Sequence, residues 1–137
     1  KIFVDVMIKP FKGELKDNLQ YCWYANDKIG TNYGGFYGSL LNGMYKEISS
    51  NGNLIVQGTY ENGLKDGVWK YWYKNGRLKR IENWNKGVKA KEQEFDVKGT
   101  IQEIQTSDNQ KDTLKTPWYK RLFKKNQAHS TKNENQH

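Results

Sequence analysis

The alternation of apolar and polar residues predicts a chain built mainly from β-strands. In residues 1–9 the apolar side chains of Ile2, Val4, Val6 and Ile8 occupy every second position. A period of two is typical of a strand that buries one face. Pro10 ends this strand, because proline has no N–H to donate to a neighbouring strand.

Turn-like segments recur along the chain at nearly constant spacing. Each has strand-forming residues around a polar pair, and the pairs begin at Asn26, Asn51, Asn75 and Lys98. The intervals between these positions are 25, 24 and 23 residues. Self-similarity of this kind is typical of repeat proteins, whose units bury their apolar sides against each other. We therefore predict one continuous sheet in which Asn26, Asn51 and Asn75 lie in hairpin loops.

Residues 58–78 form the clearest unit of the repeat. Asn75-Gly76 is flanked by strand formers, and Asn62-Gly63 and Asp66-Gly67 mark the other end of the unit. Asn-Gly favours a type I′ hairpin, because both residues tolerate a positive φ. Each unit is thus expected to be two short antiparallel strands, and the chain to be a meander.

Two tryptophans of this unit do not fit simple alternation. Trp69 and Trp72 are three residues apart, which places them on opposite faces of one strand. Either a bulge resets the register or the sheet curls to cover both faces. We favour curling, and we expect an exposed aromatic strip along the open face.

The periodicity divides the chain into four segments. Residues 1–104 are predicted to form the repeat β-sheet domain, with regular repeats at about 35–104 and a degenerate unit at about 19–34. A polar linker follows at 105–115. Thr116-Pro117 begins a short basic amphipathic helix at 116–125, with Thr as N-cap and Pro in the first turn. Residues 126–137 have the composition of a polar tail. The expected fold is mainly β, an antiparallel meander of hairpin repeats with a short C-terminal helix.

The composition limits the chemistry that the chain can perform. Cys22 is the only cysteine and lies in an expected strand, so we predict a buried, inert thiol and no intramolecular disulfide. The two histidines, His129 and His137, lie in the polar tail. No metal-ligand spacing or phosphate-binding glycine loop occurs, and Glu47 and Glu82 fall where solvated strand surface is expected. We predict a protein with no catalytic residues, metal or cofactor.

The repeat resembles the bacterial variant of the MORN (membrane occupation and recognition nexus) repeat, whose carriers are often labelled antitoxin components of toxin–antitoxin modules. The matching residues are Gly43, Tyr45, Ile48, Asn51, Gly52 and Leu54 in one unit, Gly67, Trp69, Trp72, Asn75, Gly76 and Leu78 in the next, and the strand-opening aromatics Tyr60 and Trp84. The resemblance covers residues 35–104, and residues 88–94 depart from it. The resemblance implies an elongated, twisted antiparallel sheet of stacked hairpins that is used for protein or membrane association, and it implies no catalytic residues.

The net charge of +8 permits an acidic protein, anionic lipid or nucleic acid as partner. Our leading hypothesis is a non-catalytic protein-binding or structural scaffold that uses an aromatic sheet face with a basic rim. The expected partner-binding residues are Tyr71, Trp72, Tyr73, Lys70, Lys74, Arg77, Lys79 and Arg80. Because bases and aromatics interleave here, nucleic-acid binding on the same face is an alternative.

Peripheral binding to an anionic membrane is a further alternative. The basic helix would contribute Trp118, Lys120, Arg121, Phe123, Lys124 and Lys125. For this helix we favour a different role, in which it caps the open end of the sheet. The chain begins at Lys1 without a methionine, from which we expect that an upstream segment has been removed. Together with the lone cysteine and the high content of Lys and Asn, this N-terminus slightly favours a periplasmic or cell-envelope location over a cytoplasmic one.

Overall fold

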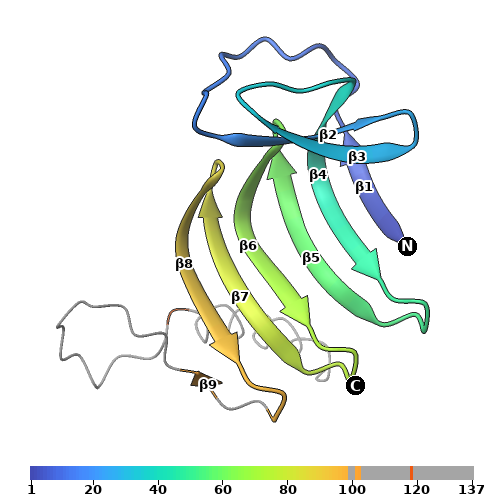
Figure 1. The fold of residues 1–137 in the computed structure, drawn as a ribbon, viewed down its shortest axis with the longest axis vertical. Coiled ribbons are helices and arrows are strands. Elements are labelled where there is room, and N and C mark those ends of the chain that lie inside the picture. Colours follow the sequence, from blue (N-terminus) through green and yellow to red (C-terminus); the bar gives the residue numbers. More distant parts are fainter. Residues whose placement is uncertain (99–100, 103–117, 119–137) are drawn as a thin grey trace, which may run out of the picture. The chain divides into compact units, whose positions relative to one another are not determined.

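The computed structural model describes residues 1–98, 101–102 and 118, the pair 101–102 by its backbone (Figure 1). The chain divides into two compact units, Lys1–Glu103 and Ile104–His137. The fold described below is that of the first unit. Of the second, the structure describes Trp118, a partly buried turn residue. The linker at 105–115, the tail at 126–137 and the remaining positions of the helix at 116–125 lie outside the described residues.

The described residues of the first unit form nine strands in one antiparallel sheet. They are β1 (Ile2–Val6), β2 (Gln20–Ala25), β3 (Lys28–Tyr33), β4 (Ser39–Ile48), β5 (Leu54–Glu61), β6 (Leu64–Trp72), β7 (Leu78–Asn85), β8 (Val88–Phe95) and β9 (Ile101–Gln102). From β4 to β9 each strand pairs with the next along the chain. The prediction of a mainly β antiparallel meander is confirmed.

Strand β4 pairs with three other strands. Its first residues, Ser39 and Leu40, pair with β2, and the rest of the strand has β1 on one side and β5 on the other. The β2–β3 hairpin crosses the end of the meander (Figure 1). Cys22 N–H donates to the Gly63 carbonyl at 2.7 Å, and Gly63 N–H donates to the Leu41 carbonyl at 2.7 Å. The first bond joins β2 to the β5–β6 turn, and the second joins that turn to β4.

The hairpin loops are of two kinds, which corrects the predicted turn type. Asn62 and Gly63 both have positive φ, 51° and 80°, as a type I′ turn requires. In the loops at 49–53 and 73–77, positive φ is found at Gly52 and Gly76 but not at the asparagine before each. The longer loops there begin with ordinary turns, for example Gly76 N–H to the Tyr73 carbonyl at 2.9 Å. The predicted positions are nevertheless correct, because the loops of one sheet contain Asn26, Asn51 and Asn75.

Most buried apolar side chains belong to two groups, and Ile81 and Phe95 are buried outside them. One group contains Leu19, Tyr21, Leu40 and Leu64. The other contains Cys22, Leu41, Tyr60 and Trp69, on one face of the meander. Both groups draw residues from β2 and β4, so the crossing hairpin shares its core with the repeats.

The ladders on both sides of β6 contain bulges, but neither bulge brings Trp69 and Trp72 to the same face. The register with β5 shifts between Gln57 and Thr59, and the register with β7 shifts between Tyr71 and Trp72. Trp69 is 1% exposed, whereas Trp72 on the other face is partly buried. The expected aromatic strip is absent from that face in β4–β6, where the paired row reads Lys46, Gln57 and Lys70.

Strand β1 lies at an edge of the sheet, and the prediction that it buries one face is wrong. Ile2 is 49% exposed and Val6 is 36% exposed, and Ile8 beyond the strand is 97% exposed. Of the predicted face, Val4 packs partly against the core. Alternation correctly indicated a strand, but it does not reveal whether another layer covers that strand.

Candidate functional site

The side chains on one face of the meander form a closely packed aromatic cluster. The ring of Trp69 lies directly over Gly58 of the neighbouring strand, where an added Cβ would be 2.1 Å from the ring. Tyr45 and Tyr60 contact the same ring at centroid distances of 5.5 Å and 4.9 Å. Trp69 Nε1–H donates to the Thr59 carbonyl at 3.2 Å, so the indole is both buried and hydrogen-bonded. This cluster is core.

A buried carboxylate, Glu82 of β7, lies beside this cluster. Glu82 is 4% exposed. Its Oε2 accepts from the Tyr71 hydroxyl at 2.9 Å and from Trp84 Nε1–H at 2.8 Å. Lys65 Nζ is 3.8 Å from Oε2, and Arg80 Nε is 3.2 Å from Oε1. A buried charge is tolerated when it is paired and hydrogen-bonded in this way.

Arg80 interacts with Glu82 through charge more than through a directed hydrogen bond. Its Nε is close to Oε1, yet among the described residues this buried N–H has no hydrogen-bond partner with acceptable geometry. The guanidinium lies 4.2 Å from the centroid of the Tyr71 ring, and its Nη1 is 3.8 Å from Glu94 Oε1. Stacking and two carboxylates therefore position Arg80.

The Lys65 ammonium is held by the same residues. Nζ donates to the Tyr71 hydroxyl at 2.9 Å and lies 4.6 Å from the Trp69 ring centroid and 4.9 Å from that of Trp84. Burial lowers the pKa of Lys65, and Glu82 opposes this shift. Burial and the nearby Glu82 raise the pKa of Tyr71, so its hydroxyl remains a donor to Glu82 at neutral pH. We call Lys65, Tyr71, Arg80 and Glu82 the charged cluster.

The expected partner-binding residues do not share one face. Tyr71 and Arg80 belong to the charged cluster, whereas Lys70 and Trp72 lie on the opposite face of β6. The Tyr73 hydroxyl donates to the Phe95 carbonyl at 3.0 Å. The other three positions follow along the chain, in the next loop and in β7: Lys74, Arg77 and Lys79.

Two basic side chains of that predicted surface, those of Arg77 and Lys79, contact neighbouring residues. Lys79 Nζ is 5.6 Å from the Tyr73 ring centroid, and Arg77 Nη1 donates to the Lys98 carbonyl. The Lys74 carbonyl accepts from Asn53 Nδ2 at 3.3 Å. The residues expected to contact a membrane lie outside the described residues, apart from Trp118: Lys120, Arg121, Phe123, Lys124 and Lys125.

A groove runs along β1, where the sequence indicated a buried strand. Its volume is about 460 Å³, and it is lined by Ile2, Phe3, Val4, Asp5, Val6 and Tyr24. Phe3 is 54% exposed. Sequence reasoning missed this groove, because Tyr24 and β1 meet only through their separate pairings with β4.

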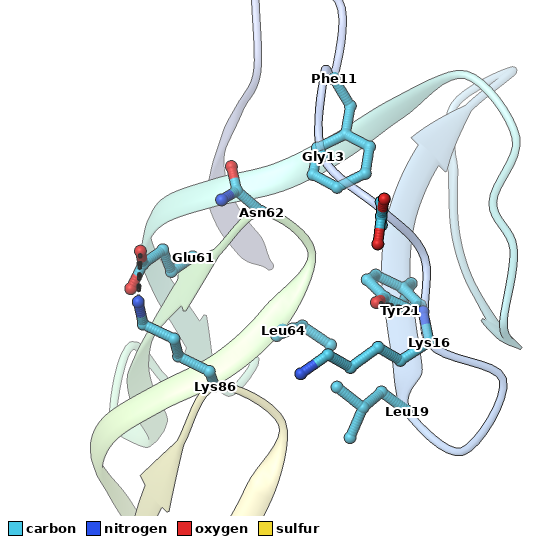
Figure 2. Close-up of a pocket in the computed structure, with 10 residues that line it drawn as sticks. Phe11, Gly13, Lys16, Leu19, Tyr21, Glu61, Asn62, Leu64 and Lys86 are labelled. Carbon is cyan, nitrogen blue, oxygen red and sulfur yellow. Dashed lines mark hydrogen bonds and ion pairs between the residues drawn. The ribbon is translucent and has the colours of Figure 1, made fainter.

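A smaller pocket lies between the segment before β2 and the hairpin turns (Figure 2). Its volume is about 250 Å³. Leu19, Tyr21 and Leu64 supply apolar walls, and Lys86 Nζ is 3.6 Å from Glu61 Oε1 at the rim. Apolar walls around a space of this size suit a small apolar group.

Other chemistry finds little support in the part of the chain that the structure describes. Cys22 is buried, as predicted, and burial raises the pKa of its thiol. Among the described residues, no group of three or more His, Cys, Asp or Glu side chains is arranged to hold a metal ion. Nor does any described helix have the length and apolarity needed to cross a membrane.

Comparison with known proteins gives no relative from which a role could be transferred. No family model matches the chain, and neither a curated protein nor a solved structure is significantly similar to it. The resemblance to the MORN repeat thus stays a prediction from the residues.

Proposed function

We propose that this chain is a non-catalytic protein-binding or structural scaffold module of stacked hairpins. The observation that carries the proposal is the groove along β1, where apolar side chains remain exposed beside Tyr24. Exposed apolar side chains that gather in one groove are typical of surfaces that bind another protein. The MORN-like repeat pattern supports the same function.

The charged cluster supports a structural role for the aromatic face of the meander. Glu82 receives two hydrogen bonds and two cations from its own chain. A catalytic acid or base needs a proton that a substrate can reach. Here the carboxylate is buried beneath Lys65 and Arg80, and all of its partners come from its own chain, which supports a structural role.

Affinity capture with reconstitution tests the proposed function. The immobilised 137-residue chain is exposed to a nuclease-treated extract of its source, and retained proteins are identified by mass spectrometry. A purified candidate should then bind the chain in solution with saturable 1:1 stoichiometry in calorimetry.

The two alternatives are tested with the same preparation. Binding to nucleic acid should show a steep loss of affinity as salt rises. Binding to a membrane should show co-sedimentation with vesicles that contain anionic lipid. Retention of vesicles or nucleic acid, together with no protein that rebinds after purification, would contradict the proposal.

A further inference from the structure

The backbone of β1 offers hydrogen-bonding groups on the edge that faces away from β4. Lys1 and Ile48 exchange two backbone hydrogen bonds, each 2.7 Å long. Hydrogen-bonded and non-hydrogen-bonded pairs alternate along an antiparallel ladder. Phe3, two residues after Lys1, pairs with Lys46, so the backbone N–H and C=O groups of Phe3 bond to β4. The N–H and C=O groups of Ile2 and Val4 therefore point away from β4. Among the described strands, β4 is the only one paired with β1.

The same edge forms one wall of the groove lined by Ile2–Val6 and Tyr24. Tyr24 belongs to β2, and its hydroxyl donates to Asp27 Oδ1 at 2.9 Å, which fixes the ring. An incoming chain would therefore find backbone donors and acceptors on one side and an aromatic ring on the other.

We propose that an extended segment of another protein, apolar at its centre and acidic at its ends, binds this groove as a strand added to β1. The inference rests on the proposed function and specifies its partner. Alternating N–H and C=O groups on an unpaired edge select an extended peptide backbone. The exposed side chains of Ile2 and Phe3 select apolar residues at its centre.

The charges around β1 select the acidic ends. Lys1 and Lys9 flank the strand, and Lys46 pairs with Phe3. Within residues 1–98, none of these three lysines is in an ion pair with a described carboxylate. Two carboxylates also lie beside the strand: Asp5 accepts from Met44 N–H at 3.1 Å, and Glu47 pairs with Ile2. The preference for acidic ends therefore rests on Lys1 and Lys9 and on the net charge of +8.

A second copy of this chain fits the groove less well. Each copy of the chain carries a net charge of +8, so two copies repel each other. A net charge far from zero keeps a protein monomeric. A partner of opposite charge avoids this repulsion.

A defined peptide probe tests the inference with the full 137-residue chain. The probe is a fluorescent synthetic peptide of alternating Val and Thr with two Glu at each end. A matched peptide carries Lys in place of Glu. We expect saturable binding of the acidic peptide in fluorescence anisotropy, and about tenfold weaker binding of the basic one at low salt.

The deciding variant is Val4→Pro, with Val4→Ala as its control. Both lose the valine side chain, which packs partly against the core. Only proline removes the outward N–H, and proline is tolerated where a strand's N–H faces away from the sheet. We expect the proline variant to bind the acidic peptide about tenfold more weakly than the alanine variant.

Folding is checked by thermal melts of every variant. If Val4→Pro does not fold, Ile2→Pro replaces it, because Ile2 also directs its N–H outward and its side chain is exposed. Equal affinity of the folded proline and alanine variants for the acidic peptide would overturn the inference.

Two further results would also overturn it by assigning the edge to another occupant. One is a wild-type dimer in analytical ultracentrifugation that Val4→Pro dissociates. The other is binding to phosphatidylserine vesicles that Val4→Pro abolishes. A protein partner captured equally by wild type and Val4→Pro would refute strand addition while leaving the protein-binding function intact.

Discussion

The charged cluster and the β1 groove both contain aromatic and charged side chains, but the cluster is buried and the groove is exposed. In the charged cluster, Glu82 is buried beside Trp69, and every charge faces a partner from the same chain. In the groove, Phe3 is exposed and the backbone edge is unpaired among the described strands. The number of flanking strands accounts for the difference. Both β6 and β7 have a strand on each side, whereas β1 has β4 as its one neighbour among the described strands.

This contrast suggests that aromatic content alone does not locate a binding surface in such a sheet. Tyr71 and Arg80 were expected from the sequence to bind a partner, yet both contact Glu82 of their own chain. A binding surface is expected at an edge strand, which has a neighbouring strand on one side only. Substitutions in the two regions should therefore have different effects on stability.

The largest difference is expected between Trp69→Ala and Phe3→Ala. The buried indole contacts Tyr45, Tyr60 and Lys65, and its removal leaves a cavity among them. We expect Trp69→Ala to lower the free energy of unfolding by about 4 kcal/mol. The Phe3 ring is largely exposed, so its loss should cost about 0.5 kcal/mol. Urea unfolding of the two variants measures this. Similar losses would mean that the β1 groove is covered in solution.

The next effect is that of Glu82→Gln, with Glu94→Gln as its control. Glutamine leaves Lys65 and Arg80 without their buried counter-charge. Because both cations are partly exposed, we expect Glu82→Gln to destabilise the fold by about 2 kcal/mol, below the cost of breaking a fully buried pair. The Glu94 side chain is more exposed than that of Glu82, and its replacement should cost about 0.5 kcal/mol. If urea unfolding shows equal costs, the cluster is more solvated than its burial indicates.

A third comparison uses Gly58→Ala and Gly35→Ala. A Cβ on Gly58 would overlap the Trp69 ring at 2.1 Å, whereas one on Gly35 would meet nothing within 4 Å. Overpacking of this kind should destabilise Gly58→Ala by about 2 kcal/mol. The Gly35→Ala variant should stay within about 0.5 kcal/mol of the wild type. Thermal unfolding distinguishes the two. A stable Gly58→Ala variant would show that Trp69 does not lie over this glycine.

The hairpins were predictable from sequence because their signals are local. Turn glycines and the intervals between polar pairs indicated the loops that contain Asn26, Asn51 and Asn75. The turn subtype was not predictable from the Asn-Gly pair, since the longer loops place only the glycine at positive φ. The pairing of β1 and β2 with β4 was not predictable from the sequence either, because no single turn connects these strands.

The bulges explain why the charged cluster was missed. A two-residue turn at Asn62-Gly63, extended without interruption, would place Trp69 opposite Val56. The bulge in β6 instead pairs Val56 with Tyr71 and leaves Trp69 over Gly58. Counting residues from a turn therefore predicts cross-strand neighbours only up to the first bulge.

The smallest expected effect is on stability at alkaline pH, and it comes from the partly buried Tyr45. Burial and Glu47 raise the pKa of Tyr45 from 10.0 to about 12. A raised pKa in the folded state means that the folded protein binds this proton more tightly than the unfolded chain. The resulting stability is complete below the unfolded pKa of 10.0 and is lost as pH rises toward the folded pKa of about 12. Tyr45→Phe should therefore reduce the fall in unfolding free energy across this range, measured by urea titration at successive pH values. An unchanged fall would show that Tyr45 ionises as it does in the unfolded chain, and that solvent reaches this part of the aromatic face.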